Sequence, residues 1–518
     1  MSRIFELGLT PAFISPLPMK HEGRFMVAIV PAIQTLKRFV YIDEKYKGNM
    51  ATYRRYVVEV MTAFGASADT VDADVKDMID FEVKVANLID WGKYINTVYS
   101  VVNVSVNSTE KILVEYINYF RQIGTLIYTT PLRTVVNYMI WTAVSGHVHL
   151  LSHPFIQAYR KLNKEFGVTT APLDQWKSCL EVVKYHMPVA CSRIFVQDYF
   201  DDTARSDTEE MFATLHQTFT QMLAEVTWMG ADMKRKAQEK ADAMVDNIGY
   251  PRWILNNTLL NAYYEMVHID RNQYFNNVNH LTLTTRRAIM TVVNTQDTLK
   301  SITWMSSPVT VNAFYYHQTN RIEFPAAMLQ PPFYHKDYPK SLNYGKIGYF
   351  IGHEITHGFD NSGRLYNKDG EKENWWTACS TEKFQRRAQC MVDQYDGYIS
   401  PQLGTPVNGT KTLGENIADN GGVKQSFRAY QTWRQTSRKA ELSLPGVDLD
   451  SNQLFFVGFA QLWCLKGTSY FYKTMAKDVH SPERFRVIGT LSNSEDFAKA
   501  YSCPVGSPMN PVKKCAVW

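Results

Sequence analysis

Residues 351–360 read Ile-Gly-His-Glu-Ile-Thr-His-Gly-Phe-Asp, and this stretch decides how the rest of the chain is interpreted. It contains an HExxH motif with His353 and His357 four residues apart. On a helix both imidazoles project from one face, where they can bind one zinc ion, and Glu354 is placed to accept a proton from a zinc-bound water. Chance would produce this motif on the order of 0.02 times in such a chain. Two histidines packed in a core are the plainer alternative.

Zinc needs a third protein ligand, with the fourth position left for water. Residues 357–363 contain no further histidine after the motif. Residues 414–419 offer two carboxylates instead, because Glu415 and Asp419 are four residues apart and share one helix face. We therefore expect Glu415 to ligate zinc and Asp419 to accept a hydrogen bond from a ligand histidine. An ExxxD pair alone is common on solvated helix faces, so this expectation depends on the HExxH motif.

Composition limits the class of protein. Of the 518 residues, 45% are hydrophobic and 20% are charged, which is typical of a globular chain. The net charge of +5 is too small and dispersed to indicate binding to nucleic acid or to an anionic membrane surface. The longest uncharged run, about 138–159, contains three histidines and Pro154, which favours a buried helix over a membrane span. Residues 1–10 do not read as a signal peptide.

Hydrophobic periodicity predicts a mainly α fold with a small β-sheet. Apolar residues at three-to-four spacing indicate helices over 50–64, 72–88, 109–128, 132–149, 175–187 and 207–248. Gly249 and Pro251 are expected to stop the last of these helices. The β-rich runs 309–316 and 321–324 predict a hairpin. We therefore expect an N-terminal helical lobe over 1–252, a connecting segment over 253–308 and a second lobe with the sheet over 309–518.

Several further segments carry a resemblance to a known family. They are Val-Asn-Ala-Phe-Tyr at 311–315, Phe-Pro-Ala-Ala-Met-Leu-Gln-Pro-Pro-Phe at 324–333, Ser-Leu-Asn-Tyr-Gly at 341–345, Leu-Gly-Glu-Asn-Ile-Ala-Asp-Asn-Gly-Gly at 413–422, Asp-Val-His-Ser-Pro at 478–482 and Cys-Ala-Val-Trp at 515–518. With these and the HExxH motif, the chain resembles the neprilysin and endothelin-converting-enzyme family of zinc endopeptidases. The resemblance implies two helical lobes enclosing a cavity, of which the second is a thermolysin-like zincin (gluzincin) catalytic lobe.

The resemblance also implies the roles of the metal-site residues. One Zn2+ per chain would be held by His353, His357 and Glu415, with Glu354 as the general base. Asp419 would orient His353, and Asp360 would support the other histidine.

The implied substrate site accepts oligopeptides and cuts them on the amino side of hydrophobic residues. His480 would stabilise the oxyanion and Arg486 would bind a substrate carbonyl, while Asn312 and Ala313 would pair with the substrate backbone along an edge strand. The side chain that follows the cleaved bond would enter an apolar pocket lined by Phe333, Tyr349, Phe350, Leu462 and Trp463. Relatives carry a smaller Met-Val pair in place of Tyr349-Phe350, so either the pocket is shallower here or this aromatic pair is plain core packing.

Cysteines and sequons bear on the compartment. There are seven cysteines and no CxxC pair, and the resemblance implies a disulfide between Cys390 and Cys515. It leaves Cys191 and Cys379 unassigned and places the partners of Cys179, Cys464 and Cys503 upstream of this chain, together with the family's membrane anchor. Glycosylation sequons occur at Asn103, Asn107, Asn256 and Asn408. The resemblance thus implies an extracellular or plasma-membrane ectodomain, shortened at its N-terminus, with membrane association only through an anchor absent from the chain.

Two rival functions remain open from the sequence. One is a catalytically inactive binding ectodomain, whose site has collapsed because the N-terminal part is missing. The other is an aminopeptidase, which is disfavoured because the amine-binding Gly-Ala-Met-Glu-Asn segment is absent.

Overall fold

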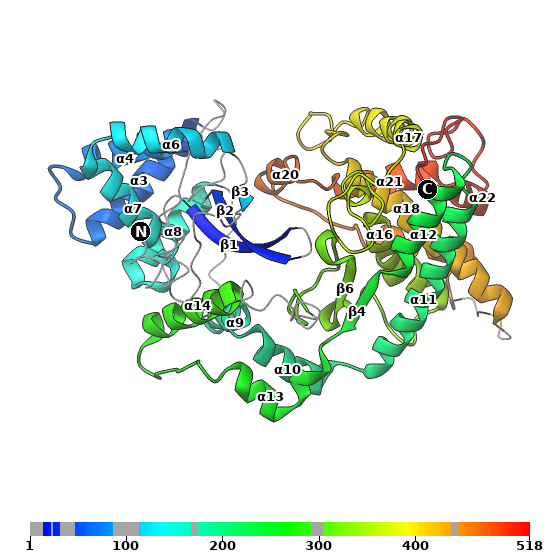
Figure 1. The fold of residues 1–518 in the computed structure, drawn as a ribbon, viewed down its shortest axis with the longest axis horizontal. Coiled ribbons are helices and arrows are strands. Elements are labelled where there is room, and N and C mark those ends of the chain that lie inside the picture. The colour runs from blue at the N-terminus through cyan, green and yellow to red at the C-terminus, as the bar shows by residue number, and fades with distance from the viewer. Residues whose placement is uncertain are drawn as a thin grey trace. The chain divides into compact units, whose positions relative to one another are not determined.

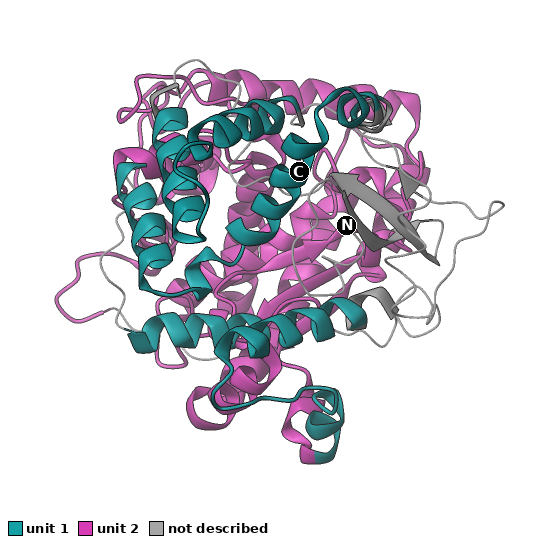
Figure 2. Cartoon of the chain, turned by 90° about the vertical axis from the view of Figure 1, so that its left-hand side faces the viewer, with its two compact units in different colours: residues 1–187, 258–302 teal, residues 188–257, 303–518 magenta. Residues whose placement is uncertain are grey.

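The computed structural model describes residues 14–21, 24–31, 47–85, 113–114, 117–166, 175–291, 304–437, 441 and 444–518. The chain forms two compact units (Figure 2), each made of two separate segments. Unit 1 comprises residues 1–187 and 258–302, and unit 2 comprises residues 188–257 and 303–518. The sequence boundaries expected at residues 252 and 308 stay a prediction.

Unit 1 is mainly helical, with one small sheet (Figure 1). Strands β1 and β2 pair antiparallel, and β3 joins β2 in parallel. The strands are β1 (Ile14–His21), β2 (Arg24–Pro31) and β3 (Leu113–Val114). The helices are α3 (Lys47–Ala63), α4 (Val71–Val85), α6 (Ile117–Thr129), α7 (Leu132–Ser145), α8 (His153–Glu165), α9 (Gln175–His186), α13 (Asn257–Tyr263, beginning at the edge of unit 2) and α14 (Tyr274–Thr291).

Large aromatic residues form the core of unit 1 where α3, α4 and α7 meet. Tyr53, Tyr138 and Trp141 are fully buried. The Trp141 indole donates a hydrogen bond to the Tyr53 hydroxyl (2.8 Å), which donates in turn to the buried Glu82 carboxylate (3.1 Å). The polar ends of these side chains are therefore satisfied inside the core, as burial of polar groups requires.

Unit 2 contains the remaining helices around a second small sheet (Figure 1). The strand order is β4-β6-β5, with β4 parallel and β5 antiparallel to β6, so β5 lies at an edge. The strands are β4 (Val245–Gly249), β5 (Phe314–Tyr316) and β6 (Arg321–Pro325). The helices are α10 (Pro188–Tyr199), α11 (Asp202–Glu225), α12 (Ala231–Asp242), α15 (Lys340–Asn343), α16 (Tyr349–His357), α17 (Ala378–Asp396), α18 (Leu413–Thr436), α19 (Ser451–Gln461), α20 (Ser469–Met475), α21 (Glu483–Asn493) and α22 (Glu495–Ala500).

The predicted fold class is confirmed, and the predicted hairpin exists as β5 and β6, although β5 is shorter than expected. The single helix expected over 207–248 is wrong. That stretch contains α11, α12 and strand β4, which pairs with β6 about 75 residues further along the chain. The expected connecting segment contains the helices α13 and α14.

The chain terminus is fixed inside unit 2. Cys390 of α17 forms a disulfide with Cys515, the pair that the resemblance implied. Trp518 is buried, and its carbonyl accepts a hydrogen bond from Lys424 of α18 (2.9 Å). Among the described residues, every helix is too short or too polar to span a bilayer.

Candidate metal centre

The two histidines of the HExxH motif lie on α16, which follows a π-helical turn over Tyr344–Gly348. Their Nε2 atoms are 3.0 Å apart, and the planes of the two rings are perpendicular. His353 is almost fully buried, whereas His357 is partly exposed. One turn of helix thus brings both imidazoles to one point, as their spacing predicted.

Glu415 reaches the same point from the first turn of α18. Its Oε2 atom lies 3.4 Å from His353 Nε2 and 3.5 Å from His357 Nε2. These three side chains offer ligand atoms within 4.8 Å of one another, and no other such group occurs among the described residues. The 55-residue segment between α16 and α18 therefore returns to α16, so that the third expected ligand meets the first two.

Each histidine has its own carboxylate on the other ring nitrogen. His353 Nδ1 lies 2.9 Å from Asp419 Oδ1, one turn after Glu415 on α18. His357 Nδ1 lies 2.7 Å from Asp360 Oδ2, and the other oxygen of Asp360 accepts hydrogen bonds from the backbone N–H groups of Ser362 and Gly363. Such contacts fix the ring plane and tautomer of a ligand histidine.

This donor set fits a zinc ion. Because carboxylates accept from both Nδ1 atoms, the Nε2 atoms are the ring nitrogens that can offer lone pairs to a metal ion once it displaces their protons, and they lie 3.0 Å apart. Glu415 Oε2 is buried beside them and accepts no hydrogen bond from any described residue. Burial alone would lower the pKa of His357, but Glu415 and Asp360 hold that pKa well above its ordinary value, so the cluster favours a positive charge. Tetrahedral zinc, with bonds of about 2.0 to 2.2 Å, separates its ligand atoms by roughly 3.3 to 3.6 Å. The two Glu415 spacings of 3.4 and 3.5 Å lie in this range, and the two Nε2 atoms, at 3.0 Å, are closer than it.

Glu354 lies on the same helix and is buried next to the cluster. Burial raises the pKa of its carboxyl above the ordinary value, and His353 and His357 oppose part of that rise. A carboxylate that is made more basic in this way is a better proton acceptor than one in water.

His480 points its ring towards the same cluster. Its Nε2 atom lies 3.3 Å from Glu415 Oε2, and its Nδ1 atom lies 2.5 Å from Asp478 Oδ1. The segment is tied to α18, because the Ser481 hydroxyl donates to Asn416 Oδ1 (2.7 Å). His480 remains about 40% exposed, so it can meet a molecule that enters from solvent.

Arg486 of α21 is buried against α18 rather than standing free. Its guanidinium donates to both oxygens of Asp419 (2.6 and 2.8 Å) and lies 3.9 Å from the centroid of the Trp463 ring. Burial alone would raise the pKa of Asp419, yet Arg486 holds it well below its usual range. Asp419 is therefore a carboxylate that can accept from His353.

The expected pocket residues gather in one aromatic cluster. Phe350 is in ring contact with Phe333, Tyr349 and Trp463 at centroid distances of 4.9 to 6.0 Å, and Leu462 precedes Trp463 in the chain. Phe333, Phe350, Leu462 and Trp463 are half-buried, whereas Tyr349 is completely buried. Tyr349 therefore lies behind the surface of this cluster.

Asn312 and Ala313 lie directly before the edge strand β5. Asn312 is exposed, and its side-chain oxygen accepts the N–H of Ala313 (3.0 Å). The position beside an edge strand suits pairing with an extended peptide.

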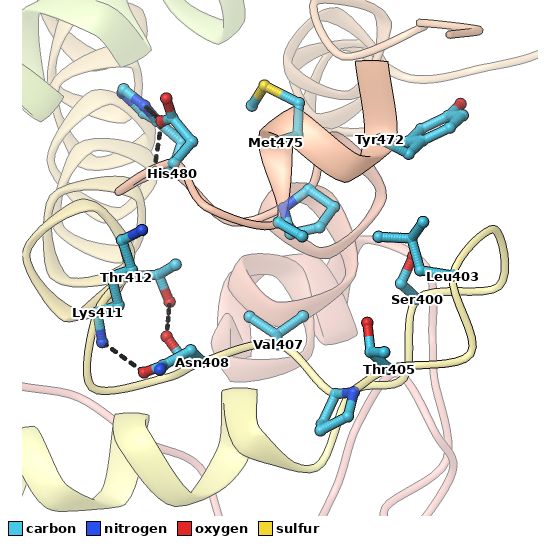
Figure 3. A pocket seen from close by; sticks show the side chains of 14 residues that line it. Ser400, Leu403, Thr405, Val407, Asn408, Lys411, Thr412, Tyr472, Met475 and His480 are labelled. Atoms are coloured by element: carbon cyan, nitrogen blue, oxygen red, sulfur yellow. Dashed lines mark hydrogen bonds and ion pairs between the residues drawn. The ribbon is translucent and has the colours of Figure 1, made fainter. Parts of the chain in front are cut away.

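A separate small pocket opens beside His480 (Figure 3). It lies between the segment over 400–412 and the end of α20, and Lys411, Asn408 and Thr412 line its polar side. His480 is the one predicted catalytic or substrate-binding residue that takes part in its lining. This pocket is therefore distinct from the aromatic cluster around Phe350.

Three contacts of the site were not predicted from the sequence. They are the Asp478 carboxylate on His480, the Tyr349 hydroxyl that donates to Asp419 Oδ1 (2.6 Å), and the buried Lys240 of α12, which binds the backbone that follows His357. Asp478 belongs to the Asp-Val-His-Ser-Pro segment, so its position two residues before His480 was an available signal. The partners of the other two lie 70 or more residues away.

Comparison with known proteins identifies the family. A model of peptidase family M13 matches residues 312–517, and a second model of that family matches residues 84–251. Human neprilysin is 36% identical over 511 residues, an alignment that covers 95% of this chain and 67% of neprilysin. The chain belongs to peptidase family M13. Human endothelin-converting enzyme 1 is 37% identical to this M13 chain over 517 residues, which cover 93% of the chain and 66% of that enzyme. The predicted family is thus confirmed, and the chain spans about two thirds of the length of these relatives.

Solved structures show the same fold. The zinc metalloprotease Zmp1 of Mycobacterium tuberculosis, in complex with an inhibitor, superposes with a TM-score of 0.86 at 23% identity, over 97% of the M13 chain and 80% of Zmp1. PepO from Lactobacillus rhamnosis HN001 gives a TM-score of 0.84 at 22% identity, over 100% of this chain and 82% of PepO. These similarities support the mainly helical architecture.

Proposed function

We propose that this M13 chain is a zinc-dependent endopeptidase that hydrolyses oligopeptides on the amino side of hydrophobic residues. The observation that carries the proposal is the convergence of His353 Nε2, His357 Nε2 and Glu415 Oε2 within one partly buried cluster. A zinc ion held by these three side chains would supply Lewis-acid activation of water and of the scissile carbonyl.

The chain's own residues would then move protons and stabilise charge. The Glu354 carboxylate accepts the proton of the attacking water and returns it to the leaving nitrogen, a role that its raised pKa suits. The Nε2 atom of His480 donates to the developing oxyanion. Asp419 and Asp360 keep both ligand imidazoles in the tautomer that leaves Nε2 free for metal.

The substrate would bind as an extended strand. Asn312 and Ala313, next to the edge strand β5, would pair with the peptide backbone, and the N–H of Ala313 would then exchange the Asn312 side chain for the substrate. The half-buried faces of Phe350 and Trp463 would receive the side chain that follows the cut. Arg486 would donate a hydrogen bond to a substrate carbonyl, and its bond to Asp419 would hold the guanidinium in place.

Replacing Glu354 tests the mechanism. Glu354→Gln keeps the shape of the side chain and all three metal ligands but cannot accept a proton, so we expect one zinc per chain and a loss of kcat of about 10²- to 10⁴-fold. Zinc content is measured by metal analysis, and kcat with a quenched peptide in the presence and absence of a chelator. The exposed Glu209→Gln on α11 is the matched control. Peptide hydrolysis that persists in Glu354→Gln would exclude Glu354 as the base.

The same assay separates the rival functions. Stoichiometric zinc without any peptide hydrolysis in the unaltered chain would favour the inactive binding ectodomain. A substrate with a blocked N-terminus should still be cut by an endopeptidase and be spared by an aminopeptidase. A peptide library with varied residues after the cut measures the hydrophobic preference.

We also propose an extracellular or plasma-membrane ectodomain as the setting. The disulfide between Cys390 and Cys515 suits an oxidising compartment. The sequons at Asn256 and Asn408 lie on exposed side chains, and those at Asn103 and Asn107 fall outside the described residues. Mass shifts after treatment with a glycosidase would test these sites.

A further inference from the structure

Lys240 on α12 is a buried lysine whose ammonium group contacts only the interior of unit 2. Its side chain is about 1% exposed, and its Nζ atom donates to the backbone carbonyls of Gly358 (2.6 Å), Gly363 (2.7 Å) and Tyr366 (2.8 Å). A lysine ammonium has three N–H donors, so these three acceptors match its full donor capacity. Burial lowers the pKa of Lys240 to about 7, which the Asp360 carboxylate opposes.

The three carbonyls belong to one short segment, residues 358–366, which begins directly after His357. This segment carries Asp360, whose carboxylate lies 2.7 Å from His357 Nδ1. Two residues beyond this segment, the carbonyl of Lys368 accepts a hydrogen bond from the side-chain amide of Asn320 (3.2 Å), which also donates to the carbonyl of Lys240 (2.9 Å). The backbone that follows the HExxH helix is therefore fixed through α12.

We propose that Lys240 is a positioning residue for the metal centre, which fixes residues 358–366 and, through Asp360, the ring of His357. The inference rests on the proposed zinc site. It assigns separate anchors to the two histidines, because the carboxylate on His353 is held by Arg486 of α21 instead. Loss of Lys240 should thus loosen one metal ligand and leave the other in place.

The test variant is Lys240→Met in the full chain, which keeps the apolar stem and removes the ammonium. We expect zinc affinity to fall by about tenfold or more, because loss of groups that orient metal ligands costs 10- to 100-fold. Zinc affinity is measured by titrating the metal-depleted protein with zinc against a competing chelator, which needs no catalysis. With Co2+ as a spectroscopic probe, the visible absorption should also change, and kcat should fall while the KM for a peptide stays constant.

Lys234→Met is the matched control on the same helix. Lys234 is only partly buried and donates to a single carbonyl, that of Ala224 (2.6 Å), so its loss should leave zinc affinity unchanged. The path through Asp360 is tested by a double-mutant cycle with Asp360→Asn. If Lys240 acts through this carboxylate, the double variant should bind zinc no more weakly than the weaker single variant.

Folding is checked by circular dichroism, and Lys240→Gln, which keeps two N–H donors, provides a milder change. A folded variant that binds zinc as tightly as the unaltered chain would overturn the inference and leave the proposed function intact. Failure of both variants to fold would also overturn it, because Lys240 would then serve unit 2 as a whole. An unaltered chain that binds no zinc would instead contradict the proposed function.

Discussion

At the scale of single residues, the site depends on how each carboxylate is shared. Asp419 Oδ1 accepts from His353 (2.9 Å), Tyr349 (2.6 Å) and Arg486 (2.6 Å). Three donors on one buried oxygen leave this carboxylate little freedom to rotate. Asp360 is fixed just as firmly by two backbone N–H groups. The imidazoles are therefore oriented by groups that are themselves held in place, as a metal site requires.

Tyr349 is the residue on which the two interpretations of the aromatic pair before the motif differ. Its ring is completely buried against Phe350, Phe459 and Trp463, and its hydroxyl donates to Asp419. The side chain thus fills the space behind the half-buried aromatic cluster of Phe333, Phe350 and Trp463. A smaller residue at this position would leave a cavity there, open towards Phe350.

We predict that Tyr349→Val deepens the substrate pocket. The KM for peptides with a large aromatic residue after the cut should fall, and the free energy of unfolding should decrease by about 2 to 4 kcal/mol because a buried ring is lost. Tyr349→Phe, which keeps the ring, should retain the preference of the unaltered chain. Cleavage of a peptide library and urea unfolding measure the two effects. An unchanged preference in Tyr349→Val would mean that Tyr349 is core packing alone.

At the scale of elements, the site depends on how closely α16 and α18 approach. A Cβ atom on Gly422 would lie 2.8 Å from the backbone nitrogen of His353 and 2.8 Å from the carbonyl oxygen of Tyr349. A Cβ atom on Gly352 would lie 2.9 Å from the carbonyl oxygen of Gly422. These are backbone contacts, so neither helix can accept a side chain there without moving. The glycines let the helix with the histidines and the helix with Glu415 touch.

Gly422→Ala should therefore separate the two helices. We expect the free energy of unfolding to decrease by about 1 to 3 kcal/mol from overpacking, and zinc affinity to fall because Glu415 moves away from both imidazoles. Chemical unfolding and zinc titration measure the two quantities. Gly230→Ala is the control, since nothing lies within 4 Å of the added atom, and it should leave zinc affinity unchanged. Unchanged zinc binding in Gly422→Ala would show that the helix contact does not set the ligand spacing.

Local patterns predicted the elements that carry the chemistry, and non-local pairing explains what they missed. The HExxH spacing predicted α16, and alternating β-rich residues predicted β5 and β6. Strand β4 lies where the sequence predicts the end of a helix, because its Val-Asp-Asn-Ile-Gly sequence has no clear period and its partner β6 lies far along the chain. The break between α11 and α12 was missed for a similar reason. Trp228 and Met229 in that break are buried in the core of unit 2, so they continue an apolar pattern without a helix.

At the scale of the whole molecule, each compact unit combines segments from two parts of the chain. Sequence patterns change along the chain and therefore predict contiguous lobes; they carry no sign that residues 258–302 group with the first segment. At the metal centre, too, local patterns do not predict contacts between distant parts of the chain. Short spacings predict His353, Glu354, His357 and Glu415. The sequence around Lys240 predicts only an amphipathic helix and carries no sign of the three carbonyls that this lysine binds.

Unit 1 should respond to acid through His147, which is buried, and through two neighbouring histidines. His147 is buried, with its Nδ1 2.9 Å from the carbonyl oxygen of Ala143, and burial lowers its pKa below the ordinary value, with Arg286 adding to the effect. Partial burial also lowers the pKa values of His149 and His186, although part of the His149 side chain is exposed to solvent. Repulsion from the neighbouring imidazoles lowers both pKa values further.

We predict that unit 1 loses stability as the pH falls below about 6.5, the pKa of histidine in an unfolded chain. Between that value and the lower folded pKa values, the unfolded state binds more protons, so the free energy of unfolding decreases as the pH decreases. Hydrogen exchange of residues 132–166, corrected for intrinsic rates, should therefore accelerate between pH 7.5 and pH 5.5. His147→Gln, which keeps a donor for the Ala143 carbonyl, should weaken that dependence. Equal acceleration in both proteins would show that acid acts on unit 1 through other groups.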